Sequence, residues 1–225
     1  MIYEPSPNHD DRDGPVSLLV MHYTGMPTAR AAIDLLTSPR AKVSAHYVVD
    51  EDGTVYSLVP EARRAWHAGV SYWRGRRMLN DASIGIEIVN PGHAWGYRSF
   101  PDVQMRAVLA LSREIIARHG ISARNVVAHS DIAPNRKQDP GELFAWSWLA
   151  THGVGIWTED FAPSTDWQKD LAFIGYDMTL PAHDVLLAFQ RHFLPSHLTG
   201  MADAATIGRA ASLCRLVVDA SGEQS

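Results

Sequence analysis

The stretch VSLLVMHYT, residues 16–24, constrains the fold of this chain most. Its near-continuous apolar run is typical of a strand that is covered on both faces of a sheet. The segment ARAAIDLLTS, residues 29–38, follows with helical spacing and ends before Pro39. A buried strand followed at once by a helix indicates an α/β arrangement.

Further segments continue this alternation of strands and helices. Residues 44–59, SAHYVVDEDGTVYSLV, predict two strands with Asp52 and Gly53 in the turn between them. Strands are also expected at 83–89 and 125–130, and a long helix at 101–120, between Pro101 and Gly120. The expected fold class is therefore α/β, with a mixed central β-sheet flanked by helices and a small helical part at the C-terminus.

The boundary between these two parts is placed in the polar stretch TEDFAPSTD. It gives a catalytic domain at 1–157, a linker at 158–166 and a helical domain at 167–225. Two amphipathic segments, 184–194 and 202–218, supply helices of the second domain.

Composition limits the class of protein. A hydrophobic content of 46% excludes disorder as the main state, and a net charge of -5 argues against nucleic-acid binding. Cys214 is the only cysteine, so any metal must be held by imidazole and carboxylate groups. The sequence shows neither a secretory signal nor a transmembrane segment, and it predicts a cytoplasmic location. It does not predict an oligomeric state.

Two histidines stand at equivalent places in the predicted sheet. His22 and His129 each come at the carboxyl end of a strand, where open α/β sheets place their ligand sites. Either histidine alone is more often structural. Asp131 and Asp139 both remain possible as a third ligand. Two imidazoles and one carboxylate would leave the fourth position of a tetrahedral zinc open, as in hydrolytic sites.

Glu87 and Lys137 are the remaining candidates for catalysis. Glu87 interrupts one face of an otherwise apolar strand, where desolvation raises a carboxyl pKa toward the range of a general base; a structural ion pair is the alternative. Lys137 lies two residues before Asp139, and an ammonium group beside a metal can stabilise an oxyanion.

Five segments in order resemble the zinc-dependent N-acetylmuramoyl-L-alanine amidases of the amidase-2 type, whose fold is that of the peptidoglycan recognition proteins. They are VMHYT, SAHYVVDEDGTVYSLV, AWHAG, SIGIEIVNPG and AHSDIAPNRKQDPG, within residues 16–150. The resemblance implies that His22, His129 and Asp139 bind Zn²⁺ and that Glu87 and Lys137 are catalytic.

The same resemblance implies a set of substrate-binding residues, namely His46, Trp66, His67 and Asn90. One position departs from the family, because some members carry a tyrosine where this chain has Ala45. Glu87 is then the leading base, as in AmpD-like and AmiD-like members. The segment 167–225 resembles a small three-helix peptidoglycan-binding domain, so the resemblance implies a C-terminal three-helix domain beside the sheet. A helical bundle that only covers the catalytic domain is the alternative.

The function implied by the resemblance is hydrolysis of the amide between the lactyl group of N-acetylmuramic acid and L-alanine. The partners are peptidoglycan fragments. A cytosolic enzyme would meet 1,6-anhydro-muropeptides during cell-wall recycling, whereas an exported one would meet polymeric peptidoglycan or released muropeptides. The rival function is a peptidoglycan recognition module that binds muropeptides without cutting them.

Overall fold

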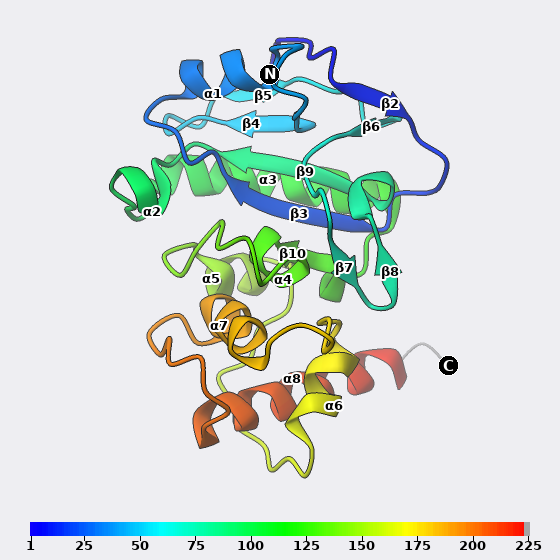
Figure 1. Ribbon diagram of the computed structural model, residues 1–225, viewed down its shortest axis with the longest axis vertical. Coiled ribbons are helices and arrows are strands. Elements are labelled where there is room, and N and C mark those ends of the chain that lie inside the picture. Colours follow the sequence, from blue (N-terminus) through cyan, green and yellow to red (C-terminus); the bar gives the residue numbers. More distant parts are fainter. Residues whose placement is uncertain (223–225) are drawn as a thin grey trace.

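The computed structural model describes residues 1–222 and contains a six-stranded sheet with the order β1-β5-β4-β9-β3-β10 (Figure 1). Its strands, in that order, are β1 (Ile2–Tyr3), β5 (Val55–Ser57), β4 (Tyr47–Val49), β9 (Ser83–Ile88), β3 (Leu18–Tyr23) and β10 (Val126–Ala128). The four strands from β4 to β10 are parallel, and β4 pairs with β5 in antiparallel fashion. The predicted mixed sheet is thereby confirmed.

Two short ribbons and several helices surround this sheet. The ribbons pair β2 (His9–Asp11) with β6 (Arg63–Ala65), and β7 (Tyr72–Trp73) with β8 (Arg76–Arg77). The α-helices are α1 (Ala29–Leu36), α2 (Gly92–Trp95), α3 (Asp102–His119), α4 (His129–Ile132), α5 (Trp146–Thr151), α6 (Trp167–Ile174), α7 (Ala182–Phe193) and α8 (Ala204–Gly222). Two 3₁₀ turns, η1 (Leu79–Ala82) and η2 (Ala123–Asn125), precede β9 and β10.

The ends of the helices follow local sequence signals. The side chain of Thr28 accepts a hydrogen bond from the Ala31 N–H and caps α1. Helix α3 stops at Gly120, whose φ of 63° is left-handed and whose N–H reaches the carbonyl of Ile116. These caps account for the agreement between expected and observed helix limits.

One expected element ends earlier than the sequence indicated. The strand expected at 125–130 stops at Ala128, and His129 opens α4 instead. Because the chain leaves the extended conformation there, residues 129 and 131 no longer share one face of a strand.

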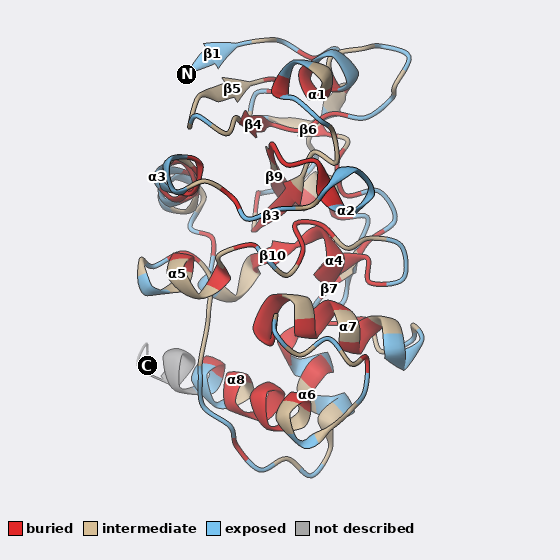
Figure 2. Cartoon of the chain, turned by 90° about the vertical axis from the view of Figure 1, so that its left-hand side faces the viewer, coloured by how far each residue is buried: buried red, intermediate tan, exposed pale blue. Residues whose placement is uncertain are grey.

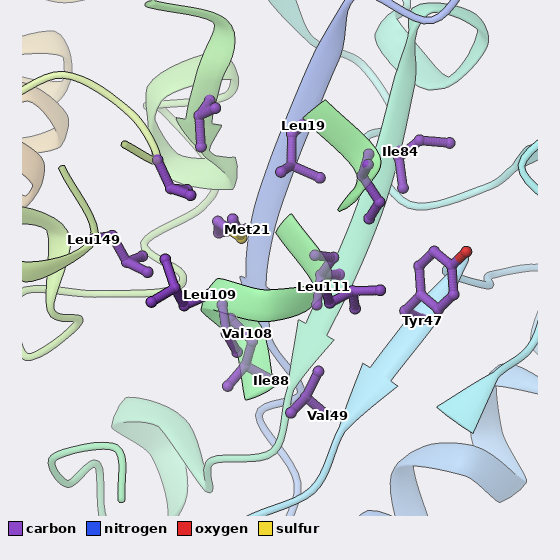
Figure 3. Close-up of a cluster of buried hydrophobic side chains, with 14 of the residues drawn as sticks. Leu19, Met21, Tyr47, Val49, Ile84, Ile88, Val108, Leu109, Leu111 and Leu149 are labelled. Carbon is purple, nitrogen blue, oxygen red and sulfur yellow. The ribbon is translucent and has the colours of Figure 1, made fainter. Parts of the chain in front are cut away.

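The two faces of the sheet have different partners. Leu19 and Met21 of β3, with Ile84 and Ile88 of β9, belong to a hydrophobic cluster that α3 completes (Figure 3). The alternate residues of the same strands, including His22 and Glu87, face the opposite side. One face therefore forms the core, and the other is free to carry polar side chains at its carboxyl edge.

The C-terminal helices lie beyond the β10 edge of the sheet (Figure 1). Leu18, Val20 and Val127 of the sheet share a buried cluster with residues of α6, α7 and α8, and red segments mark this buried region in Figure 2. The segment 158–166 contains no helix or strand. The domain limits 1–157 and 167–225 stay predictions, and residues 223–225 lie outside the described part of the chain.

Within residues 1–222, none of the helices combines the length and apolar character needed to cross a membrane. The expected cytoplasmic location stays a prediction from the sequence.

Candidate active site

The parallel strands bring the expected site residues to one edge of the sheet. His22 is near the end of β3 and is in register with Glu87 of β9. Strand β10 pairs with β3 on its other side and ends one residue before His129. Since the three strands are parallel, their carboxyl ends meet at the same edge, where open α/β sheets bind ligands.

His22, His129 and Asp139 converge on one point. The two Nδ1 atoms of the histidines are 2.9 Å apart, and Oδ2 of Asp139 is 3.1 Å from His22 Nδ1 and 3.0 Å from His129 Nδ1. All three side chains are buried. Among the described residues, they form a group whose ligand atoms lie within 4.8 Å of one another.

The charge states of this cluster suit a divalent cation. Burial, with the neighbouring His129, lowers the pKa of His22 to about 4, so its imidazole is neutral near pH 7. Burial acts to raise the pKa of Asp139, but the two histidines outweigh it and hold this pKa well below its ordinary value. Neutral imidazole and ionised carboxylate are the forms that coordinate zinc.

The path of the loop 129–140 determines which of the two aspartates, Asp131 or Asp139, lies beside the two histidines. After α4 the chain turns back, and the N–H of Ser130 donates to the carbonyl of Asp139 at 3.0 Å. This contact holds Asp139 beside His129. Asp131 points away from the cluster and accepts hydrogen bonds from the hydroxyl of Tyr176 and the backbone N–H of Ala128. The structure therefore places Asp139 in the cluster, whereas Asp131 contacts Tyr176, between α6 and α7, and His192 of α7.

Glu87 lines the same pocket as His129 and Asp139. Its Oε2 atom is buried and, within the described residues, has no hydrogen-bond partner. Burial and the negative charge of Asp139 raise the pKa of Glu87 well above its ordinary value, whereas Lys137 acts in the opposite direction. The structural ion pair considered as an alternative for Glu87 is absent from the ion pairs of residues 1–222. A desolvated, unpaired carboxylate has the character of a general base.

A pocket of about 390 Å³ opens onto these groups. Glu87, His129, Lys137 and Asp139 contribute to its wall. Apolar side chains of α1 and the following loop, including Leu35 and Val43, line another part of it. The pocket thus combines two of the three metal-binding candidates, His129 and Asp139, with Glu87, Lys137 and room for a ligand.

The four expected substrate-binding residues occupy different places. Trp66 and His67 line the pocket. His46 is fully buried, and its Nδ1 accepts a hydrogen bond from the Gly85 N–H at 3.0 Å. Asn90 is also buried, and its amide donates to the carbonyl of Arg98 at 2.7 Å. His46 and Asn90 are not among the residues of the pocket wall, and their role in substrate binding stays a prediction.

Tyr23 is a pocket residue that the sequence reasoning did not single out. It lies directly after His22, lines the pocket, and its hydroxyl is 3.1 Å from Nδ1 of His93. Its place next to a strand-end histidine is the signal that could have identified it.

The mixed sheet and the buried His-His-Asp cluster at its carboxyl edge define an α/β protein with a candidate divalent-metal centre. A family profile described as N-acetylmuramoyl-L-alanine amidase (Amidase_2) matches residues 12–142. The chain belongs to this family.

Sequence comparison with individual proteins supports this family assignment. The chain is 40% identical to the N-acetylmuramoyl-L-alanine amidase AmiD of Escherichia coli (strain K12), over 85% of this chain and 79% of that protein. It is 37% identical to the 1,6-anhydro-N-acetylmuramyl-L-alanine amidase AmpD of Enterobacter cloacae, over 64% of this chain and 84% of that protein.

Among solved structures, the E. coli AmiD complex with anhydro-N-acetylmuramic acid-L-Ala-D-gamma-Glu-L-Lys matches with a TM-score of 0.81. The sequence identity is 36%, and the match covers 92% of both chains. The match therefore extends beyond the part of the chain that the family profile covers, residues 12–142.

Proposed function

We propose that this chain is a zinc-dependent N-acetylmuramoyl-L-alanine amidase of peptidoglycan turnover and recycling. Its substrate would be a muropeptide, in particular one with 1,6-anhydro-N-acetylmuramic acid, and the bond cut would be the amide between the lactyl group and L-alanine. The observation that carries the proposal is the cluster of His22, His129 and Asp139 at a pocket whose wall includes His129, Asp139 and Glu87. Among the described residues, Oε2 of Glu87 has no hydrogen-bond partner. AmiD, which is similar over most of its length, has been solved with such an anhydro-muropeptide.

The donor set fits zinc because it offers two imidazoles and one carboxylate from the protein, the ligand number of hydrolytic zinc sites. Zinc held by His22, His129 and Asp139 would supply Lewis acidity toward a water molecule and the scissile carbonyl.

Glu87 would move the proton in this reaction. Its unpartnered Oε2 accepts a proton from the attacking water, since no competing hydrogen bond from the described residues holds that oxygen. The same carboxyl group then donates the proton to the nitrogen of the departing L-alanine. The C–N bond breaks, leaving a free lactyl carboxylate on the sugar and a free amino group on the stem peptide.

Lys137 would stabilise the negative charge that develops on the carbonyl oxygen. It lines the pocket together with Glu87 and Asp139. A positive charge fixed at a developing oxyanion lowers the barrier because it interacts more strongly with the transition state than with the neutral amide. Trp66, in the same wall, would contact the substrate beside the reacting bond.

Mass spectrometry of products tests this function. The protein is incubated with anhydro-N-acetylmuramyl-tripeptide, first as purified, then with a chelator, and then with Zn²⁺ restored. Release of free tripeptide that stops with the chelator and returns with Zn²⁺ is expected. A reducing-end muramyl tripeptide in a parallel reaction measures the preference for the anhydro sugar. Binding of both muropeptides without any release would contradict the proposal and identify a recognition module.

A further inference from the structure

A chain of hydrogen bonds runs from His22 away from the metal-binding candidates. Nε2 of His22 is 3.0 Å from Nδ1 of His67, and Nε2 of His67 is 3.1 Å from Oγ of Ser83. Oγ of Ser83 also lies 2.7 Å from the carbonyl oxygen of Leu79. His22, His67 and Ser83 are all buried, so water has little access to these contacts.

The direction of each hydrogen bond in this series follows from the last acceptor, the carbonyl oxygen of Leu79. A carbonyl oxygen can only accept, so the hydroxyl of Ser83 donates to Leu79. Oγ of Ser83 then accepts from Nε2–H of His67, which leaves Nδ1 of His67 as an acceptor. That nitrogen accepts from Nε2–H of His22. His22 is thereby held as the tautomer whose Nδ1 carries the lone pair, and Nδ1 is the atom that faces His129 and Asp139.

Ala68, the residue after His67, fixes the tautomer of His129 by a similar contact. The carbonyl oxygen of Ala68 lies 3.4 Å from Nε2 of His129, so this nitrogen is the donor and Nδ1 is free for a metal. Arg136 also donates to this carbonyl. The side chain of Asn80 accepts from the backbone N–H groups of His67 and Ala68, at 3.1 and 2.7 Å. His67 and Ala68, whose backbone N–H groups both donate to Asn80, thus contact the Nε2 atoms of the two metal-binding candidates. His67 contacts His22, and Ala68 contacts His129.

Gly85 provides the space for the His67 ring. A Cβ atom on this residue would lie 2.5 Å from Nδ1 of His67, closer than nonbonded atoms can approach. Gly85 is in β9, two residues before Glu87. The imidazole of His67 therefore packs directly against the strand that carries the proposed base, and any side chain at position 85 would displace it.

We infer that His67 is a positioning residue of the metal centre, which fixes the tautomer and ring orientation of His22 while Ala68 does the same for His129. This role rests on the proposed function, because it assumes that the two histidines bind the metal. Outer partners of this kind change the affinity for the metal by about 10- to 100-fold when they are removed. His67 then acts through His22, and contact with substrate is not required for its effect.

Zinc affinity is the first test, measured on the full chain by competition with a chromophoric chelator. His67→Phe keeps a ring but has no acceptor, and we expect Zn²⁺ to bind it about 10- to 100-fold more weakly. His67→Asn places an amide oxygen close to the position of Nδ1, and it should retain more of the affinity than His67→Phe. Ser83→Ala, which leaves the imidazole in place but removes its directing partner, should weaken binding by a smaller factor.

Ser112→Ala is the matched control for Ser83→Ala. Ser112 is equally buried, lies in α3, and its hydroxyl has no hydrogen-bond partner within the described residues. Its substitution should leave zinc affinity unchanged. An equal loss in Ser83→Ala and Ser112→Ala would show a general effect on folding and would overturn the inference.

Long-range ¹H–¹⁵N spectra of the metal-free protein give a second readout that does not depend on activity. They report which nitrogen of each imidazole carries the proton, and Nε2–H is expected for His22 and His67 in the unsubstituted protein. In Ser83→Ala, His67 should lose this fixed tautomer. The opposite tautomer of His22 in the unsubstituted protein would overturn the inference.

The results separate this inference from the proposed function. If the unsubstituted protein binds no Zn²⁺, the proposed metal centre itself is wrong, and the inference falls with it. If the unsubstituted protein binds Zn²⁺ and cleaves the muropeptide while His67→Phe and Ser83→Ala bind zinc equally well, only the positioning role is wrong.

Discussion

His22 and Glu87 are direct neighbours across the parallel pair of β3 and β9. Adjacent strands are about 4.8 Å apart, so this register places a metal-binding candidate and a carboxylate side by side on one face of the sheet. A shift of one residue in β9 would turn Glu87 into the hydrophobic core, and the same shift in β3 would turn His22 there. Strand register thus sets the position of the proposed base relative to His22, whereas α4 and the loop after it place His129 and Asp139.

Glu87→Gln should abolish most of the activity without harming the fold. The amide has the same size but cannot take a proton, and loss of a general base commonly costs about 10²- to 10⁴-fold in rate. Because Oε2 of Glu87 is buried without a partner, the substitution should not lower the unfolding temperature. Product release by mass spectrometry and thermal unfolding measure both effects. Activity within tenfold of the unsubstituted enzyme would exclude Glu87 as the base.

Lys137→Met should lower kcat by about 10²- to 10³-fold, since it removes the positive charge proposed to stabilise the oxyanion. Lys169→Met is the matched control, because Lys169 lies on α6 with 85% of its side chain exposed. Steady-state kinetics on the anhydro-muropeptide compare the two variants. Equal rates in both would show that Lys137 does not take part in the reaction.

Zinc should stabilise the folded protein against heat, because a ligand that binds the native state alone adds about 2.7 kcal/mol when its concentration is 100 times Kd. Chelation should reverse this stabilisation. Asp139→Asn should remove most of it, since the amide is a much poorer ligand, whereas Asp34→Asn on the exposed face of α1 should not. Scanning calorimetry with and without Zn²⁺ gives the comparison. If Zn²⁺ still raised the unfolding temperature of Asp139→Asn by the same amount, the metal would bind elsewhere.

Tyr176→Phe should destabilise the protein by about 1–3 kcal/mol. The hydroxyl of Tyr176 donates to Asp131 at 2.6 Å, and both residues are buried, so the substitution leaves a carboxylate oxygen short of one donor. His192 of α7 binds the other oxygen of Asp131 at 2.6 Å, and the contact therefore fastens the C-terminal helices to α4. Urea unfolding measures the loss. Tyr3→Phe, at a tyrosine that is 65% exposed, serves as the control and should have no effect.

Glu61→Gln should reduce stability at neutral pH by roughly 1–3 kcal/mol and weaken its pH dependence in acid. Burial acts to raise the pKa of Glu61, but hydrogen bonds from Arg118, Tyr47 and His119 lower it from 4.5 to about 2. A carboxyl pKa that folding lowers adds stability above the unfolded value of 4.5, and this contribution is lost as the pH falls from 4.5 to 2.

Urea unfolding of both proteins between pH 7 and pH 2 provides the test, and the difference between them isolates Glu61. Glu114→Gln serves as the control, since Glu114 also contacts Arg118 but has 64% of its side chain exposed. A difference between Glu61→Gln and the unsubstituted protein that stays constant from pH 7 to pH 2 would contradict the prediction.

The sequence alone was sufficient for the main strands and helices of the α/β fold and for the candidate residues at their ends. It did not predict β1, the two short ribbons or the short helices α2, α4 and α5. The apolar run of β3, the turn at Asp52 and Gly53 and the glycine stop of α3 are local signals, and local signals act within a few residues of the chain. Family resemblance added the choice of Asp139. From the residues alone this choice stayed open, because Asp131 and Asp139 follow His129 in the same loop.

Tertiary structure decided what each of these side chains faces. Asp131 forms hydrogen bonds with Tyr176 and His192, which lie 45 and 61 residues away along the chain. The sequence around Asp131 contains no pattern that predicts these partners. Nδ1 of His67 lies next to His22 because Gly85 of β9 has no side chain and leaves room for the His67 ring. Spacing along the chain predicts which residues share an element, whereas hydrogen bonds between elements depend on register and packing across the whole fold.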